Sequence, residues 1–179
     1  MSEMLTQRLR LRPLVPGDAP ALAAYRSDPT VARFQPWITP FTVTDAEMLI
    51  EELSQSDPTQ PGWFQYAVEL LADGTVIGDL GVRLHKNKMQ AEIGFTIAAD
   101  QQGNGYGPEA VSKMLDHLFT DVGLHKISAE CDARNGASAH LLQRVGFRQE
   151  GLLRSNTFLK DEWTDDMLFG LLADEYAPT

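Results

Sequence analysis

The chain has 179 residues, 43% of them hydrophobic, which is long enough to bury the core of one domain and short for two. Its formal net charge of −10 argues against non-specific binding of nucleic acid, which needs a basic patch, and is compatible with a cationic amine or a basic peptide as partner. Acidity that only keeps a protein in solution explains the charge equally well. We expect one domain over residues 1–179.

Several classes of protein are disfavoured by the same sequence. Met1 to Pro16 alternates Arg with Leu and lacks the apolar segment of a signal peptide, and no apolar run approaches the length of a membrane span. We therefore expect a soluble, cytoplasmic protein with no membrane partner. The lone Cys131 excludes an internal disulfide framework, and its apolar neighbours favour a small core residue over a nucleophile. The four histidines show no metal-ligand spacing, so we expect no metal.

The first predicted element is a strand. Arg8 to Leu14 alternates so that Leu9 and Leu11 share one face, and the arginines are expected to form a solvated face opposite. Pro13 ends the strand.

Two helices should follow this strand. Asp18 is a plausible N-cap for a helix to about Ser27, and Thr44 with Glu47 has the spacing of a capping box for a second helix that ends near Gln55. Either a substrate-facing wall or ordinary core packing would account for the aromatic residues of the connecting segment, which are Phe34, Trp37 and Phe41.

The middle of the chain is predicted to form three antiparallel strands. Trp63 to Leu71 and Thr75 to Leu84 flank a turn at 72–74, and a polar turn leads to the strand Ala91 to Ile97. This segment supplies the first half of the sheet.

A crossover follows. Apolar residues spaced along one stripe predict a helix over Ala110 to Val122, ended by Gly123, and His125 to Cys131 should then run parallel to the strand Ala91 to Ile97. Asn135 is predicted to cap a further helix, which Gly146 ends.

A closing antiparallel pair, roughly Phe147 to Asn156 and Asp166 to Leu172, completes the expected fold. We expect an α/β fold with a mixed, mostly antiparallel sheet of about six to seven strands, a central parallel pair and flanking helices.

The segment Gln102 to Glu109 lies between a strand and a helix and carries three alternating glycines. Its backbone amides and the N-terminus of the helix suit a phosphate. It is not a dinucleotide-binding loop, because Pro108 stands three residues after Gly105, and it lacks the lysine of a P-loop. A purely structural connection is the alternative.

The segment does match Gln-x-x-Gly-x-Gly, as Gln102, Gly105 and Gly107, and so resembles the pyrophosphate loop of the GNAT superfamily of acetyl-CoA-dependent N-acetyltransferases. The resemblance covers almost the whole chain and is greatest to the RimJ/RimL-like branch, the ribosomal-protein N-terminal acetyltransferase type. It is carried by Thr6 to Arg12, Glu92 to Phe95, Gln102 to Ala110, Asn135 with Ser138, Val145 to Phe147, Glu150 to Arg154 and Trp163 with Asp166.

The resemblance implies a single-domain GNAT fold with acetyl-CoA as co-substrate. It implies that the pyrophosphate lies on the loop and that pantetheine lies like an added strand beside the strand end, with a backbone N–H near Ile97 available to the oxyanion. The cofactor-binding residues it implies are Phe95, Ile97, Gln102, Gly103, Asn104, Gly105, Tyr106, Gly107, Asn135 and Ser138.

Catalysis by direct transfer needs a base for the amine and an acid for the departing thiolate. Glu92 is the first candidate for the base, because a carboxylate on a central strand is costly to bury unless paired or used. A structural ion pair with an arginine is the alternative role of Glu92, and Asp79 is the second candidate. Leu142 occupies the position where many relatives have a tyrosine, so Ser138, or water, is expected to protonate the thiolate.

The expected function is transfer of an acetyl group to a primary amine, either a protein N-terminus or a small molecule. The alternative is a non-catalytic domain that binds acetyl-CoA or CoA in a regulatory or interaction role. The resemblance leaves the acceptor open, and it leaves a monomer and a homodimer both open.

Overall fold

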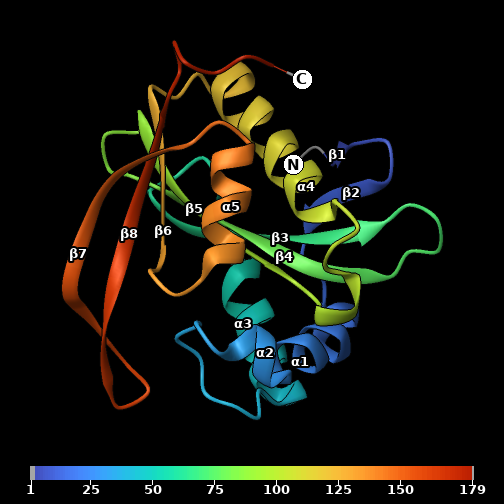
Figure 1. The fold of residues 1–179 in the computed structure, drawn as a ribbon. Coiled ribbons are helices and arrows are strands. Elements are labelled where there is room, and N and C mark those ends of the chain that lie inside the picture. Colours follow the sequence, from blue (N-terminus) through green and yellow to red (C-terminus); the bar gives the residue numbers. More distant parts are fainter. Residues whose placement is uncertain (1–2, 179) are drawn as a thin grey trace.

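The computed structural model describes residues 3–178, which are arranged around one eight-stranded sheet with the order β1-β2-β3-β4-β5-β6-β8-β7 (Figure 1). The strands are β1 (Met4–Leu5), β2 (Leu9–Pro13), β3 (Gly62–Leu70), β4 (Val76–Leu84), β5 (Gln90–Ile97), β6 (Lys126–Asp132), β7 (Arg148–Leu159) and β8 (Glu162–Leu172). Within residues 3–178, only β5 and β6 pair in parallel. The expected fold class is confirmed, with eight strands in place of six or seven.

The helices are α1 (Ala19–Ser27), α2 (Pro29–Ala32), α3 (Val43–Ser54), α4 (Tyr106–Asp116) and α5 (Gly136–Arg144). Short helical turns precede α1, follow β5 and extend α4, and they are η1 (Pro16–Asp18), η2 (Ala99–Gln101) and η3 (His117–Asp121). Among the helices of residues 3–178, none is both long and apolar enough to cross a membrane.

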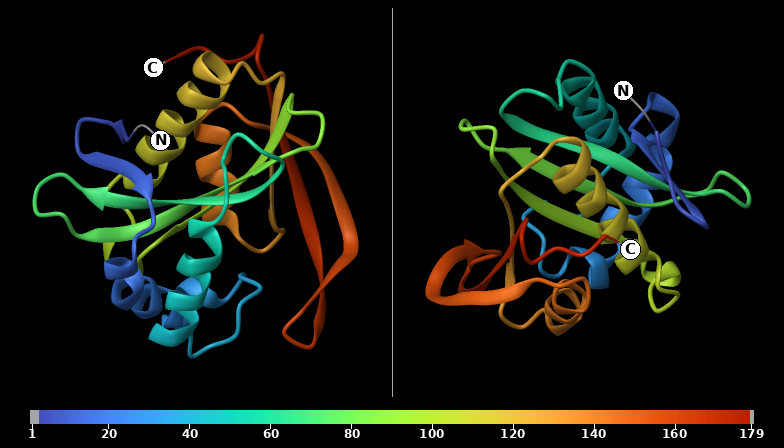
Figure 2. Two further views of the ribbon diagram at one scale, coloured as in Figure 1. Left: turned by 180° about the vertical axis from the view of Figure 1, so that it is seen from behind. Right: turned by 90° about the horizontal axis from the view of Figure 1, so that it is seen from above.

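Two layers of helices cover the sheet. One core cluster joins α4 to the side chains on one face, which include Tyr66 and Val68, and a second cluster joins α1 and α3 to the opposite face at Ala67 (Figures 1 and 2). Strand alternation makes this possible, because successive side chains of β3 point to opposite faces. Leu9 and Leu11 are fully buried, as predicted, and burial of such a side chain contributes about 1.5–3 kcal/mol.

The solvated face expected for the arginines of β2 is wrong for Arg12. Its side chain is only 14% exposed, with Nη1 2.7 Å from Asp18 Oδ2 and Nε 2.6 Å from Glu69 Oε2. Both carboxylates are buried and need a cation nearby. Asp18 is therefore used by Arg12 and by the Val15 N–H, and its side chain does not cap α1.

The N-terminus of α3 lies two residues earlier than the predicted capping box at Thr44 and Glu47. Thr42 Oγ1 accepts a hydrogen bond from the Asp45 N–H at 3.1 Å, and Asp45 Oδ2 accepts one from the Thr42 N–H at 2.8 Å. Both pairs have the same spacing, so the local pattern does not separate them. Ala46, Ile50 and Leu53 are the residues of α3 that are buried in the core.

Helix α4 begins at Tyr106, four residues before the predicted start, so the end of the glycine segment forms its first turn. A turn of π-helix over His117–Asp121 extends it, and Gly123 ends it with φ +77°. The predicted apolar stripe is buried, apart from Val122, which is 47% exposed.

The parallel ladder between β5 and β6 is short, and the point where it ends determines where the sheet opens. Strands β5 and β6 pair from Gln90 with Lys126 to Ile93 with Ala129, after which β5 has no partner on that side while β6 stays paired to β8 as far as Asp132. The sheet therefore opens into a fork between the end of β5 and the end of β6.

The closing hairpin is longer than predicted and projects from the sheet, turning at Lys160 and Asp161, which have φ 49° and 66° (Figures 1 and 2). Its tip reaches back to the N-terminal half. Lys160 Nζ donates to the Ala32 carbonyl, and Glu162 pairs with Arg134 at 2.8 Å. These contacts tie the hairpin to the segments that border the fork.

Candidate active site

The free edge of β5 presents backbone groups to the fork. The Ala98 N–H donates to the Ile77 carbonyl of the neighbouring strand at 2.8 Å, so alternate residues of β5 bond to β4 and those between them face the other way. By this alternation, the N–H groups of Phe95 and Ile97 point into the fork. An extended ligand could bond there as an added strand.

A cavity of about 400 Å³ runs from this edge to the glycine segment. Nine of the ten residues predicted to bind cofactor line it, and they are Phe95, Ile97, Gln102, Gly103, Gly105, Tyr106, Gly107, Asn135 and Ser138. The tenth, Asn104, does not line this cavity and borders a pocket on the other side of the loop.

The loop has the backbone shape that an anion site needs. Gly103 and Gly105 have φ +79° and +81°, in the left-handed region that favours glycine. Gln102 Nε2 donates to the Ile97 carbonyl at 2.9 Å and so fixes the loop to the end of β5. Within residues 3–178, no protein group accepts from the N–H groups of Gly103 to Gly105, so these amides are available to a ligand.

Asn135 caps α5 as predicted, because its Oδ1 accepts from the Ser138 N–H at 3.2 Å. The cap uses the backbone of Ser138 and leaves its hydroxyl uncommitted. Both residues line the smaller cavity and also a larger one, so they lie where the two meet.

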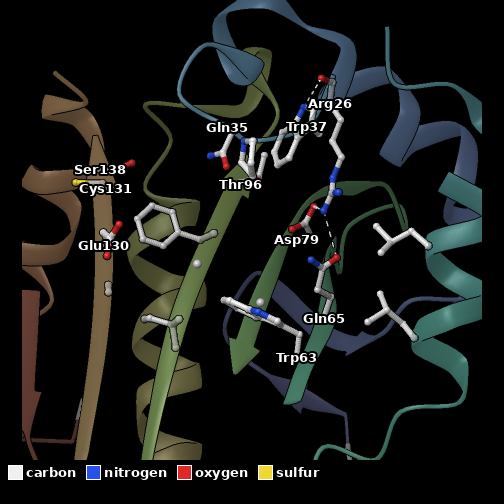
Figure 3. Close-up of a pocket in the computed structure, with 18 of the residues that line it drawn as sticks. Arg26, Gln35, Trp37, Trp63, Gln65, Asp79, Thr96, Glu130, Cys131 and Ser138 are labelled. Atoms are coloured by element: carbon white, nitrogen blue, oxygen red, sulfur yellow. Dashed lines mark hydrogen bonds and ion pairs between the residues drawn. The ribbon is translucent and has the colours of Figure 1, made fainter. Parts of the chain in front are cut away.

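The larger cavity has a volume of about 890 Å³ and lies across the fork (Figure 3). Trp37 and Phe34 contribute to one wall, while Glu130 and Cys131 of β6 contribute to another. Figure 3 shows Ser138, Cys131 and Glu130 together on one side and Arg26 with Asp79 on the other. Phe34 and Trp37 of the aromatic segment line this cavity, while Phe41 packs against the second core cluster, so core packing accounts for Phe41 and a substrate-facing role of the other two stays a prediction.

Asp79, the second candidate for the base, lines the larger cavity but is only 4% exposed and is held by two partners. Tyr25 Oη donates to its Oδ2 at 2.7 Å, and Arg26 Nη2 lies 3.1 Å from the same atom. Burial, reinforced by the Asp79 charge, raises the pKa of Tyr25 well above 10.0. The Arg26 guanidinium also lies 4.5 Å from the centre of the Trp37 ring, so this network holds in place the aromatic wall of the cavity, which is formed by Phe34 and Trp37.

Glu92 lines neither of these two cavities. Its carboxylate pairs with Arg83, its partner across the β4–β5 ladder, as the structural alternative for this residue anticipated. A role for Glu92 as the base stays a prediction, and the ion pair favours the structural role.

Glu130, which the sequence reasoning missed, lines the larger cavity on the β6 side, and unlike Asp79 it has no hydrogen-bond or ion-pair partner among residues 3–178. Burial raises its pKa, and the charges of Asp166 and Glu92 raise it further, although Arg83 opposes them. A usable signal was the alternation of β6, which places Ser128 and Glu130 on one face.

Cys131 is half-buried and packs against the first core cluster, as expected of a small core residue, and it also lines the larger cavity. Burial, with the nearby charges of Asp132, Asp166 and Glu130, raises the pKa of its thiol to about 11. It is therefore protonated at neutral pH and is a poor nucleophile. Among the described side chains, no three of His, Cys, Asp or Glu gather as a metal site.

Comparison with known proteins defines the class. Residues 8–148 match the family of the acetyltransferase (GNAT) domain. A Bacillus licheniformis protein described as the uncharacterized N-acetyltransferase p20 is 34% identical over 99% of both chains. Mycobacterium smegmatis RimJ, solved in complex with CoA-disulfide, is 30% identical with a TM-score of 0.81, covering 93% of this chain and 83% of that one. A Bacillus anthracis acetyltransferase, with a TM-score of 0.88 and 24% identity, covers 97% of this chain and 100% of that one and supports the fold.

The chain belongs to the GNAT family of acetyltransferases, and its relatives include proteins of the RimJ/RimL type. The Vibrio cholerae spermidine N(1)-acetyltransferase is 31% identical over 48% of this chain and 50% of that protein. The chain described here is therefore an acyltransferase, and its family uses acetyl-CoA.

Proposed function

We propose that this chain, as one N-acetyltransferase domain, moves the acetyl group of acetyl-CoA to a primary amine that enters through the larger cavity. The observation that carries the proposal is the meeting of the two cavities at the fork. Six residues line both cavities, and they are Phe34, Gln35, Phe95, Thr96, Asn135 and Ser138. A thioester at this junction would be reached from both sides.

The cofactor would lie along the smaller cavity. Its pyrophosphate would accept hydrogen bonds from the free N–H groups of the Gly103–Gly105 segment, and the N-terminus of α4 would favour its negative charge. Pantetheine would bond to the backbone of Phe95 and Ile97 as an added strand. The Phe95 N–H, at the junction of the two cavities, would then be available to the oxyanion that forms on attack, whereas Ile97 lines the smaller cavity alone.

For the proton of the amine, the geometry favours Glu130 over Glu92. Glu130 lines the acceptor cavity and has no hydrogen-bond or ion-pair partner in the described part of the chain, and a carboxylate with a raised pKa is a stronger base. The neutral amine attacks the carbonyl carbon, its proton passes to Glu130 directly or through water, and the C–S bond breaks. Ser138, whose hydroxyl lies at the junction, would give a proton to the thiolate and regain one from water.

The acceptor that suits the larger cavity is an amine with additional positive charge. Glu52, Asp57 and Glu130 contribute carboxylates to its lining, and Trp37 and Trp63 contribute aromatic faces. Carboxylates and aromatic faces both attract cations. Two relatives are named for acceptors of different kinds. One is the Vibrio cholerae spermidine N(1)-acetyltransferase, named for a small polyamine, and the other is the Escherichia coli [ribosomal protein uS5]-alanine N-acetyltransferase, named for a protein.

The test is a panel of amines, with and without a second positive charge, incubated with enzyme and acetyl-CoA. We expect CoA thiol and N-acetylated product to form in equal amounts, with the highest kcat/KM for polycationic amines. Binding of CoA without turnover of any amine would instead support a non-catalytic CoA-binding domain. Turnover only of uncharged amines or of peptide termini would contradict the acceptor assignment.

A further inference from the structure

Arg8 lies against the outer side of the glycine segment, although it comes from the other end of the sequence. It immediately precedes β2, which runs beside the N-terminal end of α4 (Figure 1). Its Nη1 donates to the Asn104 carbonyl at 3.0 Å, and its guanidinium lies 4.5 Å from the centre of the Tyr106 ring. One side chain therefore contacts two consecutive parts of the loop.

Glu109, in the first turn of α4, fixes the position of that guanidinium. Its Oε2 lies 2.7 Å from Arg8 Nε and 2.6 Å from Arg8 Nη2, and its Oε1 accepts from the Arg8 N–H at 3.0 Å and from Thr6 Oγ1 at 2.6 Å. Burial opposes the charge of Glu109, but the hydrogen bonds from Thr6 and Arg8 outweigh it and lower its pKa. The ionised carboxylate thus accepts from Arg8 Nε and Nη2 with one oxygen and from the Arg8 N–H with the other, which restricts the orientation of the side chain.

The bond to the Asn104 carbonyl has a consequence on the opposite side of the same peptide. A trans peptide is planar, and its C=O and N–H point in opposite directions. Fixing the Asn104 oxygen toward Arg8 therefore aims the Gly105 N–H away from Arg8, toward the smaller cavity. That N–H has no protein acceptor in residues 3–178, and Gly105 itself lines this cavity.

We propose that Arg8 is a positioning residue for the cofactor, which acts by holding the Asn104–Gly105 peptide in the orientation that binds pyrophosphate. The inference rests on the cofactor placement under Proposed function. Without Arg8 the exposed loop samples other orientations, and the free energy of ordering it is subtracted from the binding free energy. Arg8 does not contact the cofactor in this account, and its effect passes through the loop.

The test compares Arg8→Gln with Arg10→Gln in the full chain. Arg10 is a matched control, because it lies two residues away in β2, its side chain is 38% exposed against 43% for Arg8, and it pairs with Glu3 and Glu69 rather than with the loop. Calorimetric titration with CoA needs no knowledge of the acceptor. We expect the Kd of Arg8→Gln to rise on the order of tenfold, at low and at high salt alike, and that of Arg10→Gln to stay near wild type.

Two further readouts separate positioning from general stability. With a substrate amine, Arg8→Gln should raise KM for acetyl-CoA and leave kcat at saturation near wild type, and Arg8→Lys should recover part of the affinity. Wild-type affinity in Arg8→Gln, or an equal loss in Arg10→Gln, would overturn the proposal. A loss that disappears at high salt would also overturn it, because it would indicate direct attraction between Arg8 and the phosphates. Failure of the wild-type chain to bind CoA would instead overturn the cofactor placement.

Discussion

Ile93 and Ala129 form the last pair of the parallel ladder, and every residue of β5 beyond Ile93 has a free edge toward β6. Both proposed binding regions depend on this end point. The smaller cavity follows the free edge to the glycine segment, and the larger one opens on the other side between β5, β6 and the aromatic wall. A ladder longer by four pairs would reach Ile97 and satisfy the backbone groups that we assign to pantetheine.

Gly94 should be replaceable without loss of the fold and with loss of acceptor binding. A Cβ built at Gly94 meets no atom within 4 Å, and Gly94 lines the larger cavity. We expect Gly94→Val to keep the thermal midpoint and the CoA affinity of wild type while kcat/KM for the amine falls about tenfold or more. Gly17→Ala, also into open space but remote from both cavities, is the control. Full activity in Gly94→Val would place the acceptor elsewhere.

Glu130 should determine the acid limb of the pH–rate profile. Since its pKa is raised, the carboxylate is protonated, and inactive as a base, at higher pH than an ordinary glutamate. In Glu130→Gln we expect kcat/KM to fall about 100-fold and the limb assigned to this residue to vanish. In Glu92→Gln the limb should remain and move to lower pH, because one charge that raises the Glu130 pKa is gone. The opposite assignment, with Glu92 as base, predicts that Glu92→Gln removes the limb.

Ser138→Ala tests the proton donor without disturbing α5. The helix cap uses the Ser138 N–H, which alanine retains. We expect kcat to fall about 100-fold with an unchanged thermal midpoint. Ser112→Ala, on α4 and outside both cavities, should have no effect. An unchanged kcat would indicate that water protonates the thiolate.

Asp132 should stabilise the fold only above its own pKa. Hydrogen bonds from the Arg134 side chain and N–H lower this pKa below 3.8, so the stabilisation is complete above the unfolded-state value and is lost as the pH falls through the folded-state value. Asp132→Asn should lower the free energy of unfolding at pH 7 by about 1–3 kcal/mol. The unfolding curves of wild type and variant should converge in acid, while the exposed Asp174→Asn control should match wild type throughout. A constant difference at all pH values would argue against the ion pair.

The strongly periodic elements were predictable from the sequence. The hairpin β3–β4 and the stripe of α4 are local patterns, and the glycine segment is a run of neighbouring residues whose spacing is visible in the chain. The two-residue strand β1 is too short to show a period. The start of α3 was misplaced because Thr42 with Asp45 and Thr44 with Glu47 have the same spacing.

What the sequence could not provide depends on contacts between distant residues. Arg12 is buried because Glu69, 57 positions away, needs a cation. Glu130 is distinguished from Glu92 by the cavity that it lines and by the Arg83 ion pair of Glu92, and both depend on how the strands are arranged in the sheet. The contact of Arg8 with Asn104 joins positions 96 apart, and no local pattern predicts it.

The central claim is that the segment from Gln102 to Gly107 holds the pyrophosphate of acetyl-CoA. Calorimetric titration of acetyl-CoA into wild type and Gln102→Ala/Gly105→Val tests it most directly. The double substitution removes the bond to the Ile97 carbonyl and places a branched side chain at φ +81°, where the added Cβ lies 3.4 Å from Arg8. We predict a loss of affinity of about 100-fold or more in a variant that keeps its circular dichroism spectrum. Wild-type affinity in that folded variant would contradict the account.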